Sequence, residues 1–443
     1  MGRHPRQLTE VGGSLDGLLR AGLVASLVNG ATALAVPLLS LPILLGALGN
    51  EQYGLWVTVA AVAAVLGVLD LGVGNAALTQ IASAADAQER ARAIKAMYLV
   101  AGGVSAAVLC AWIVLSGLTD VADLLGADGV PRAGALVHLA IVSATLSLPA
   151  LLIYKVQIGL GRQASSHLTQ ATAACLVAAG LLGLTFLDAD SFLMLVLVAC
   201  LPAAVALVYT AGVLDFRRVL GVSLRGLEVS PVSKHLRMGI PIFAVTILMM
   251  LAQSLDLLLV GRSLGYDAVP EYSVPYRIFT AVGSVAVMLA GPLWALNATA
   301  LSRGDIAWVR RKTRSVALGV TVGVGLTAIF CLAAGDWILG AVLAGAVSFD
   351  LRLWSIMALT VTLQAASGPY FMVQNSVAAM KIQMVVYGFA CALLPVKFLA
   401  LKSAGLVGFS FALLLIQALL ILPAAVYGAR RVMSEREAAT CLI

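Results

Sequence analysis

The sequence predicts an all-α, polytopic membrane protein with about twelve transmembrane helices in two six-helix lobes. Of the 443 residues, 61% are hydrophobic and only 11% are charged, whereas about a quarter of the residues of a soluble globular protein carry a charge. Apolar runs as long as the ~20 residues that cross a bilayer follow one another along the chain. These runs lack the alternating pattern of barrel strands. A soluble globular protein is therefore excluded.

The apolar runs give the order of the predicted spans. They cover Gly22–Ala47, Gly54–Ile81, Ala96–Leu118, Gly134–Ile158, Leu168–Leu187, Phe192–Leu214, Met238–Val260, Tyr276–Leu301, Ser315–Leu339, Leu353–Val373, Met384–Leu401 and Ala404–Tyr427. We expect an N-terminal lobe at 1–214, a cytoplasmic linker at 215–237, a C-terminal lobe at 238–429 and a cytoplasmic tail at 430–443.

The placement of positive charge predicts the orientation in the membrane. With both termini in the cytoplasm, all of the 28 Lys and Arg residues lie on the inner side except Arg132, Arg262, Arg277, Arg352, Lys397 and Lys402. Positive residues favour the cytoplasmic side during insertion. The sequence thus predicts a multi-pass membrane protein with both termini in the cytoplasm, and its net charge of +7 needs no nucleic-acid partner.

The two halves of the chain share short sequence motifs at equivalent positions. Gly49 follows the first predicted span as Gly265 follows the seventh, and Asn75 and Asn297 lie near the ends of the second and eighth. Six spans separate the copies, so both have the same orientation. This arrangement predicts a parallel repeat about an axis along the membrane normal, with two lobes facing each other across a central cleft.

Two of these regions carry a family resemblance. Residues 48–56 (LGNEQYGLW) and 69–75 (LDLGVGN) resemble the polysaccharide transport (Wzx-like) family of lipid-linked oligosaccharide flippases. In the second half, Asp256 and the segment 272–277 (YSVPYR) are similar to the same family. The family belongs to the multidrug/oligosaccharidyl-lipid/polysaccharide exporter superfamily.

The resemblance implies a function and its partners. It implies a flippase that moves undecaprenyl-diphosphate-linked oligosaccharide, a unit of O-antigen, capsule or exopolysaccharide, from the inner to the outer leaflet by alternating access. The implied partners are this substrate, the membrane lipids and, transiently, a glycan polymerase or glycosyltransferases. No cofactor and no catalytic residue are implied.

Acidic residues inside spans are candidates for ion coupling, because a charge at the centre of a membrane helix costs about 2.5–3.5 kcal/mol. Asp70 lies deep in the second span, where its carboxylate would exchange a proton or hold a cation; the alternative is a structural hydrogen bond or salt bridge. Asp256 lies one turn from Gln253, which we consider a substrate-binding residue on the same polar face. The alternative for Asp256 is a polar outer cap paired with Arg262.

Basic and amide side chains are the candidates for binding the substrate. Arg277 offers bidentate contacts to phosphate, and Lys397 offers a point charge. Both would otherwise reach the outer headgroups. The amides of Asn75 and Asn297 would bond sugars or bridge helices.

Two other classes of function are the alternatives. An exporter of cationic drugs would place acids in the cleft, whereas Arg277 and Lys397 favour an anionic cargo. A membrane-embedded polymerase or acyltransferase usually has a sizeable outer loop or a re-entrant site, and the outer connections here are short. The four His and six Cys residues have no metal-ligand spacing, so we expect no metal site and no enzyme.

Overall fold

The chain folds into helices throughout the part that the structure describes. This computed structural model describes residues 6–66, 86–214, 229–290, 292–343, 347–377 and 379–441, together with residue 219 and single positions between 74 and 84. Its elements are α1 (Arg6–Leu66), α3 (Ala87–Leu118), α4 (Val121–Leu125), α5 (Ala133–Leu151), α6 (Ile153–Gly159), α7 (Gln163–Phe186), α8 (Ser191–Val213), α10 (Val229–Leu264), η1 (Tyr266–Ala268), α11 (Val269–Ala290), α12 (Pro292–Ser302), α13 (Ile306–Ala333), α14 (Gly335–Leu343), α15 (Leu351–Ser376), α16 (Lys381–Ala392), α17 (Leu394–Ile416), the π-helix η2 (Gln417–Ile421) and α18 (Leu422–Cys441). No strand occurs in these ranges.

The helices have the length and composition of membrane spans. Among the described residues, nine helical segments are long and apolar enough to cross a bilayer. Some of these segments hold two predicted spans, because helix continues directly on both sides of a tight turn. The predicted fold class, a polytopic all-α membrane protein, is confirmed.

Glycine residues form the turns between consecutive spans. In α1 the helix breaks at Gly49, whose φ is 72° and ψ is 172°. Gly265, which the sequence repeat pairs with Gly49, has φ 94° and ψ 156° after α10. Residues with a side chain rarely adopt these angles. The equivalent motifs of the repeat therefore form the same kind of turn in both copies.

Contacts along the chain divide it into two compact units. The first unit comprises residues 1–47, 66–121 and 134–239, and the second comprises 48–65, 122–133 and 240–443. Helix α10 begins at Val229, inside the segment expected to be a linker. The lobe boundaries given by the sequence stay a prediction.

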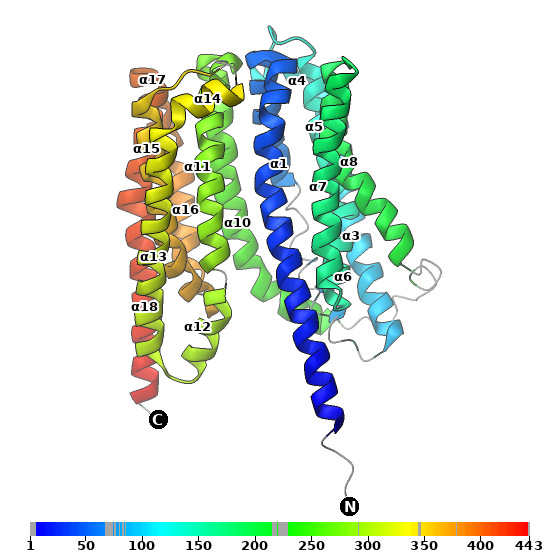
Figure 1. Ribbon diagram of the computed structural model, residues 1–443, viewed down its shortest axis with the longest axis vertical. Helices are drawn as coiled ribbons and strands as arrows, with labels where there is room; N and C mark the ends of the chain where they lie inside the picture. The colour runs from blue at the N-terminus through cyan, green and yellow to red at the C-terminus, as the bar shows by residue number, and fades with distance from the viewer. Residues whose placement is uncertain are drawn as a thin grey trace, which may run out of the picture. The chain divides into compact units, whose positions relative to one another are not determined.

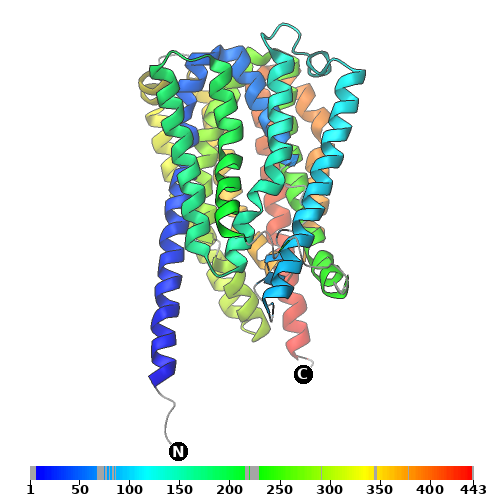
Figure 2. The same cartoon turned by 90° about the vertical axis from the view of Figure 1, so that its right-hand side faces the viewer.

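The first unit has a core of small and aliphatic side chains. It is built from α3, the end of α5, α6 and α8, and includes Met97, Ala101, Ile153, Val156 and Ala206, which are 0–1% exposed. Helix α6 packs against α7 and α8, and α7 packs along α8, as Figure 2 shows. The Ser105 hydroxyl of α3 donates a hydrogen bond to the Thr145 carbonyl of α5 at 2.9 Å. Small residues thus let these helices pack closely.

Helix α15 is the centre of the second unit. It packs against α11, α12, α13, α17 and α18 (Figure 1). Trp354 of α15 is fully buried, and its ring lies edge-on to Phe279 at 5.7 Å and to Phe349 at 5.1 Å. The Gln374 amide donates to the Ala425 carbonyl of α18 at 3.0 Å. These contacts hold the helices that carry the candidate site.

The segment 48–65 belongs to the second unit through close backbone contacts. The Ser254 hydroxyl of α10 donates to the Ala61 carbonyl at 2.7 Å. Gly54 lies against Tyr266, so closely that a Cβ at position 54 would lie 1.8 Å from the Tyr266 carbonyl oxygen. Glycine is therefore required at this contact. It places Tyr53, the preceding residue, in the interior of the unit.

Candidate functional site

A buried ion pair joins α10 to α17. Lys397 Nζ lies 2.7 Å from Asp256 Oδ1, and the two side chains are only 2% and 8% exposed. Asp256 is eight residues before the end of α10, and Lys397 is seven residues before the break in α17 at Ala404. At 1.5 Å per residue, both charges lie about 10–12 Å from the helix ends. The pair is therefore inside the apolar part of the spans.

This pairing replaces the alternatives that the sequence left open. Lys397 does not reach outward to the headgroups, because its ammonium is buried on Asp256. Arg262 is not the partner of Asp256; its Nη1 donates to the Leu124 carbonyl at 3.1 Å instead. The sequence held a signal for the depth of the two charges, though not for their pairing. Asp256 and Lys397 lie four residues before the predicted outer ends of two spans of the same direction, so opposite charges are expected at the same depth.

Aromatic residues of α11 lie near the pair. The Asp256 carboxylate interacts electrostatically with Tyr272 and Tyr276, whose rings stack at 5.8 Å with an interplanar angle of 12°. Phe409 packs edge-on against Tyr272 at 5.4 Å. Tyr272 and Phe409 are both buried. The sequence pattern alone assigns no role to these rings.

Arg277 lies one residue beyond Tyr276 and is held by an aromatic ring. Its guanidinium carbon is 5.8 Å from the centroid of the Tyr53 ring, a cation–π distance. The Arg277 side chain is half-buried, and within the described residues no carboxylate pairs with it. Its N–H donors are thus available to an anion. The Tyr53 hydroxyl is buried and has no hydrogen-bond partner among the described residues.

Asn297 is a buried amide in α12. It is 0% exposed, and neither amide atom has a hydrogen-bond partner in the part of the chain that the structure describes. A buried polar group without a partner costs about 1–3 kcal/mol, so a bound water or ligand group is the expected complement. The role of Asn297 in binding substrate stays a prediction.

Three other predicted site residues cannot be placed. Asp70 and Asn75 lie outside the described residues, and so does the side chain of Gln253. The structure thus brings together Asp256 and Lys397, and places Arg277 on the same helix as Tyr272 and Tyr276. These are the residues from which a function can be argued.

Comparison with known proteins gives a family and a fold. Residues 18–293 match the sequence profile of the family described as "Polysaccharide biosynthesis protein". No curated protein sequence matches the chain.

Three solved structures illustrate the similarity in fold. An inward-facing multidrug resistance MATE family transporter of the MOP superfamily is 14% identical, with a TM-score of 0.73, over 91% of this chain and 96% of that one. The lipid II flippase MurJ, in an inward closed conformation, is 10% identical, with a TM-score of 0.65, over 96% of this chain and 90% of that one. The Vibrio cholerae MATE transporter VcmN in its bent form is 16% identical, with a TM-score of 0.60, over 96% and 99% of the two chains. At these identities the likeness shows the fold alone.

Proposed function

Because the chain belongs to the polysaccharide biosynthesis protein family, we propose that it is a flippase for undecaprenyl-diphosphate-linked oligosaccharide. The substrate, a unit of O-antigen, capsule or exopolysaccharide, would enter from the inner leaflet and leave in the outer leaflet of the bacterial plasma membrane by alternating access. Both termini would be cytoplasmic. A glycan polymerase or glycosyltransferases would contact the protein transiently.

The observation that carries this proposal is the buried Lys397–Asp256 pair. A diphosphate left unpaired in an apolar medium has a prohibitive solvation penalty, of the order of tens of kcal/mol by Born estimates. The protein must therefore offer water or fixed cations along the path of the head group. Lys397 is such a cation, already removed from water and paired with Asp256.

An exchange of partners would let the pair act on the substrate. A diphosphate oxygen competes with the Asp256 carboxylate for the Lys397 ammonium. When the Lys397 ammonium moves to the diphosphate, the buried Asp256 carboxylate is left unpaired, which is strongly unfavourable. The carboxylate therefore takes up a proton or a cation. This step couples the movement of the head group to an ion, the role predicted for Asp256 and, in the first half of the chain, for Asp70.

Arg277 would bind the same head group from α11. Its planar guanidinium can donate two parallel hydrogen bonds to a phosphate, and it lies over the Tyr53 ring. The unpaired amide of Asn297 would serve the sugars, as would Asn75 and Gln253. The polyprenyl tail needs no such groups, because lipid solvates it.

Surface glycan output tests the proposal in a strain whose own flippase is deleted. The wild type should restore surface glycan, whereas Lys397→Met should lose most of it. Lys402→Met is the matched control, since Lys402 lies on the same helix but is exposed. Normal output from Lys397→Met, with Lys402→Met equally active, would contradict the proposed role of the ammonium.

The alternative is an ion-coupled exporter of cationic drugs, which the MATE-like fold would also accommodate. In the described residues the buried acid Asp256 is neutralised by Lys397, which favours an anionic cargo. Export of a cationic dye, measured in the same cells, distinguishes the two. Dye export without glycan export would select the alternative.

A further inference from the structure

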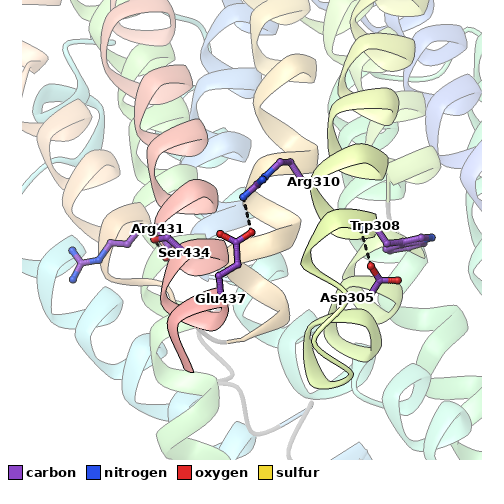
Figure 3. Close-up of polar contacts among 6 residues, drawn as sticks. All are labelled: Asp305, Trp308, Arg310, Arg431, Ser434 and Glu437. Atoms are coloured by element: carbon purple, nitrogen blue, oxygen red, sulfur yellow. Dashed lines mark hydrogen bonds and ion pairs between the residues drawn. The ribbon is translucent and has the colours of Figure 1, made fainter. Parts of the chain in front are cut away.

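The base of α13 carries exposed arginines of two kinds. Arg310, the first, forms an ion pair with Glu437 of α18 at 2.8 Å, which Figure 3 shows. Arg311 and Arg314, the second kind, are exposed, and no carboxylate within the described residues forms an ion pair with them. Arg311 and Arg314 are therefore available to bind an anion from outside the described part of the chain.

Arg311 and Arg314 lie on the lipid-facing stripe of the helix. Helix α13 is a candidate membrane span, and its buried face holds Val309, Thr313, Ala317, Val320 and Val324 at helical spacing. The opposite face continues from the two arginines through a stripe of exposed apolar residues. These are Leu318, Val322, Leu326 and Ile329, which are 51–65% exposed. A ligand of the arginines must therefore approach along the bilayer.

Trp308 and Asp305 indicate the depth of the two arginines. The Trp308 backbone N–H donates to Asp305 Oδ1 at 3.0 Å, which caps the start of α13 (Figure 3). Tryptophan is enriched at the level of the headgroups. Arg311 and Arg314 lie about 4.5 and 9 Å further along the helix, toward the apolar stripe. Their aliphatic stems can follow this surface while the guanidinium groups reach back to the phosphates.

We propose that Arg311 and Arg314 form a binding site for the phosphate of an anionic phospholipid in the leaflet at this end of α13. Guanidinium binds phosphate in a bidentate geometry, and the apolar stripe from Leu318 to Ile329 accommodates the acyl chains. An acidic protein does not fit this place, because it would have to enter the bilayer to reach the stripe. The site is independent of the transported substrate.

Native mass spectrometry of the full-length protein tests the site, with phosphatidylglycerol as the probe and phosphatidylethanolamine as the zwitterionic comparison. The wild type should retain phosphatidylglycerol in preference. The double variant Arg311→Gln/Arg314→Gln should bind it about tenfold more weakly, the loss expected for about one charge-assisted hydrogen bond. Arg311→Lys/Arg314→Lys should give an intermediate affinity, because the charge stays and the bidentate geometry is lost.

The matched control is Arg310→Gln/Arg431→Gln, which removes two arginines already paired with Glu437 and Glu435. Its affinity for phosphatidylglycerol should stay near that of the wild type. An equal loss in the control would show that net charge alone attracts the lipid. Unchanged binding in Arg311→Gln/Arg314→Gln would equally overturn the site. All four positions are exposed, so the variants should fold.

Discussion

Removing one member of the Lys397–Asp256 pair should destabilise the protein far more than removing both. At the observed 2.7 Å, the Coulomb attraction is about 6 kcal/mol for an effective dielectric constant of 20. Removal of both ions from water offsets it by several kcal/mol for each ion. The net stability from the pair is thus small, while a single buried charge without its partner is very unfavourable.

Three variants separate these terms. Lys397→Met leaves the Asp256 carboxylate unpaired, and Asp256→Leu leaves the ammonium unpaired; each should lower the free energy of unfolding by about 3–5 kcal/mol. The double variant buries two apolar side chains of similar size, and its stability should lie near that of the wild type or above it. The effects of the single substitutions should therefore be far from additive.

Equilibrium unfolding by sodium dodecyl sulfate in mixed micelles measures the cycle. Lys402→Met is the control, since Lys402 is exposed and its ammonium lies 4.8 Å from the centroid of the Phe398 ring. An exposed cation–π contact contributes about 0.5–1 kcal/mol. The reasoning is refuted if Lys397→Met is no less stable than Lys402→Met, or if the double variant loses the sum of the single losses.

Three further substitutions test other parts of the structure. Arg277→Ala should reduce glycan export more than Arg277→Lys does, since only the lysine keeps a cation; equal export by both and by the wild type would exclude phosphate binding at this position. Gly54→Ala should destabilise the folded protein, because its Cβ would overlap the Tyr266 carbonyl, whereas Gly46→Ala meets nothing within 4 Å and should leave the unfolding midpoint unchanged or higher. Asp86 accepts hydrogen bonds from backbone N–H groups at the start of α3, which lowers the pKa of its carboxyl group below the ordinary 3.8. The stability that Asp86 contributes is therefore fully present above pH 3.8 and is lost as the pH falls through the lowered pKa of the folded protein. Asp86→Ala should flatten the acid limb of a curve of stability against pH.

The spans could be predicted from the sequence because the bilayer imposes one requirement on every segment. A helix that satisfies its own backbone groups must be about 20 residues long and apolar, and this leaves a local pattern. The turns at Gly49 and Gly265 were visible for a similar reason, since a positive φ restricts the choice of residue. Such constraints act on neighbouring residues in the chain.

The pairing of Asp256 with Lys397 depends on packing and was missed. The two residues are 141 positions apart, and the apolar runs around them contain nothing that says which helices touch. Arg262 was the nearest cation in the sequence, but its guanidinium is turned to the Leu124 carbonyl. The depth of each charge could be derived from the span ends, and its partner required the fold.

The aromatic residues around the pair were missed for a different reason. Tyr272 and Tyr276 stand one turn apart on α11, a spacing that any buried face of a membrane helix shows. They differ from other buried tyrosines only in that they stack on each other, that Tyr272 packs against Phe409, and that Asp256 acts on them electrostatically. Their chemistry is thus set by helices that are distant in the sequence.

Translocation by purified protein in liposomes tests the central claim most directly. Undecaprenyl-diphosphate-linked oligosaccharide is placed in one leaflet, and its arrival in the other is followed with an enzyme that modifies exposed sugars. The wild type should transfer the lipid, and the double variant Lys397→Met/Asp256→Leu should be folded but inactive, because it holds no buried ammonium for the diphosphate. Transfer at the wild-type rate by the folded double variant would contradict the account.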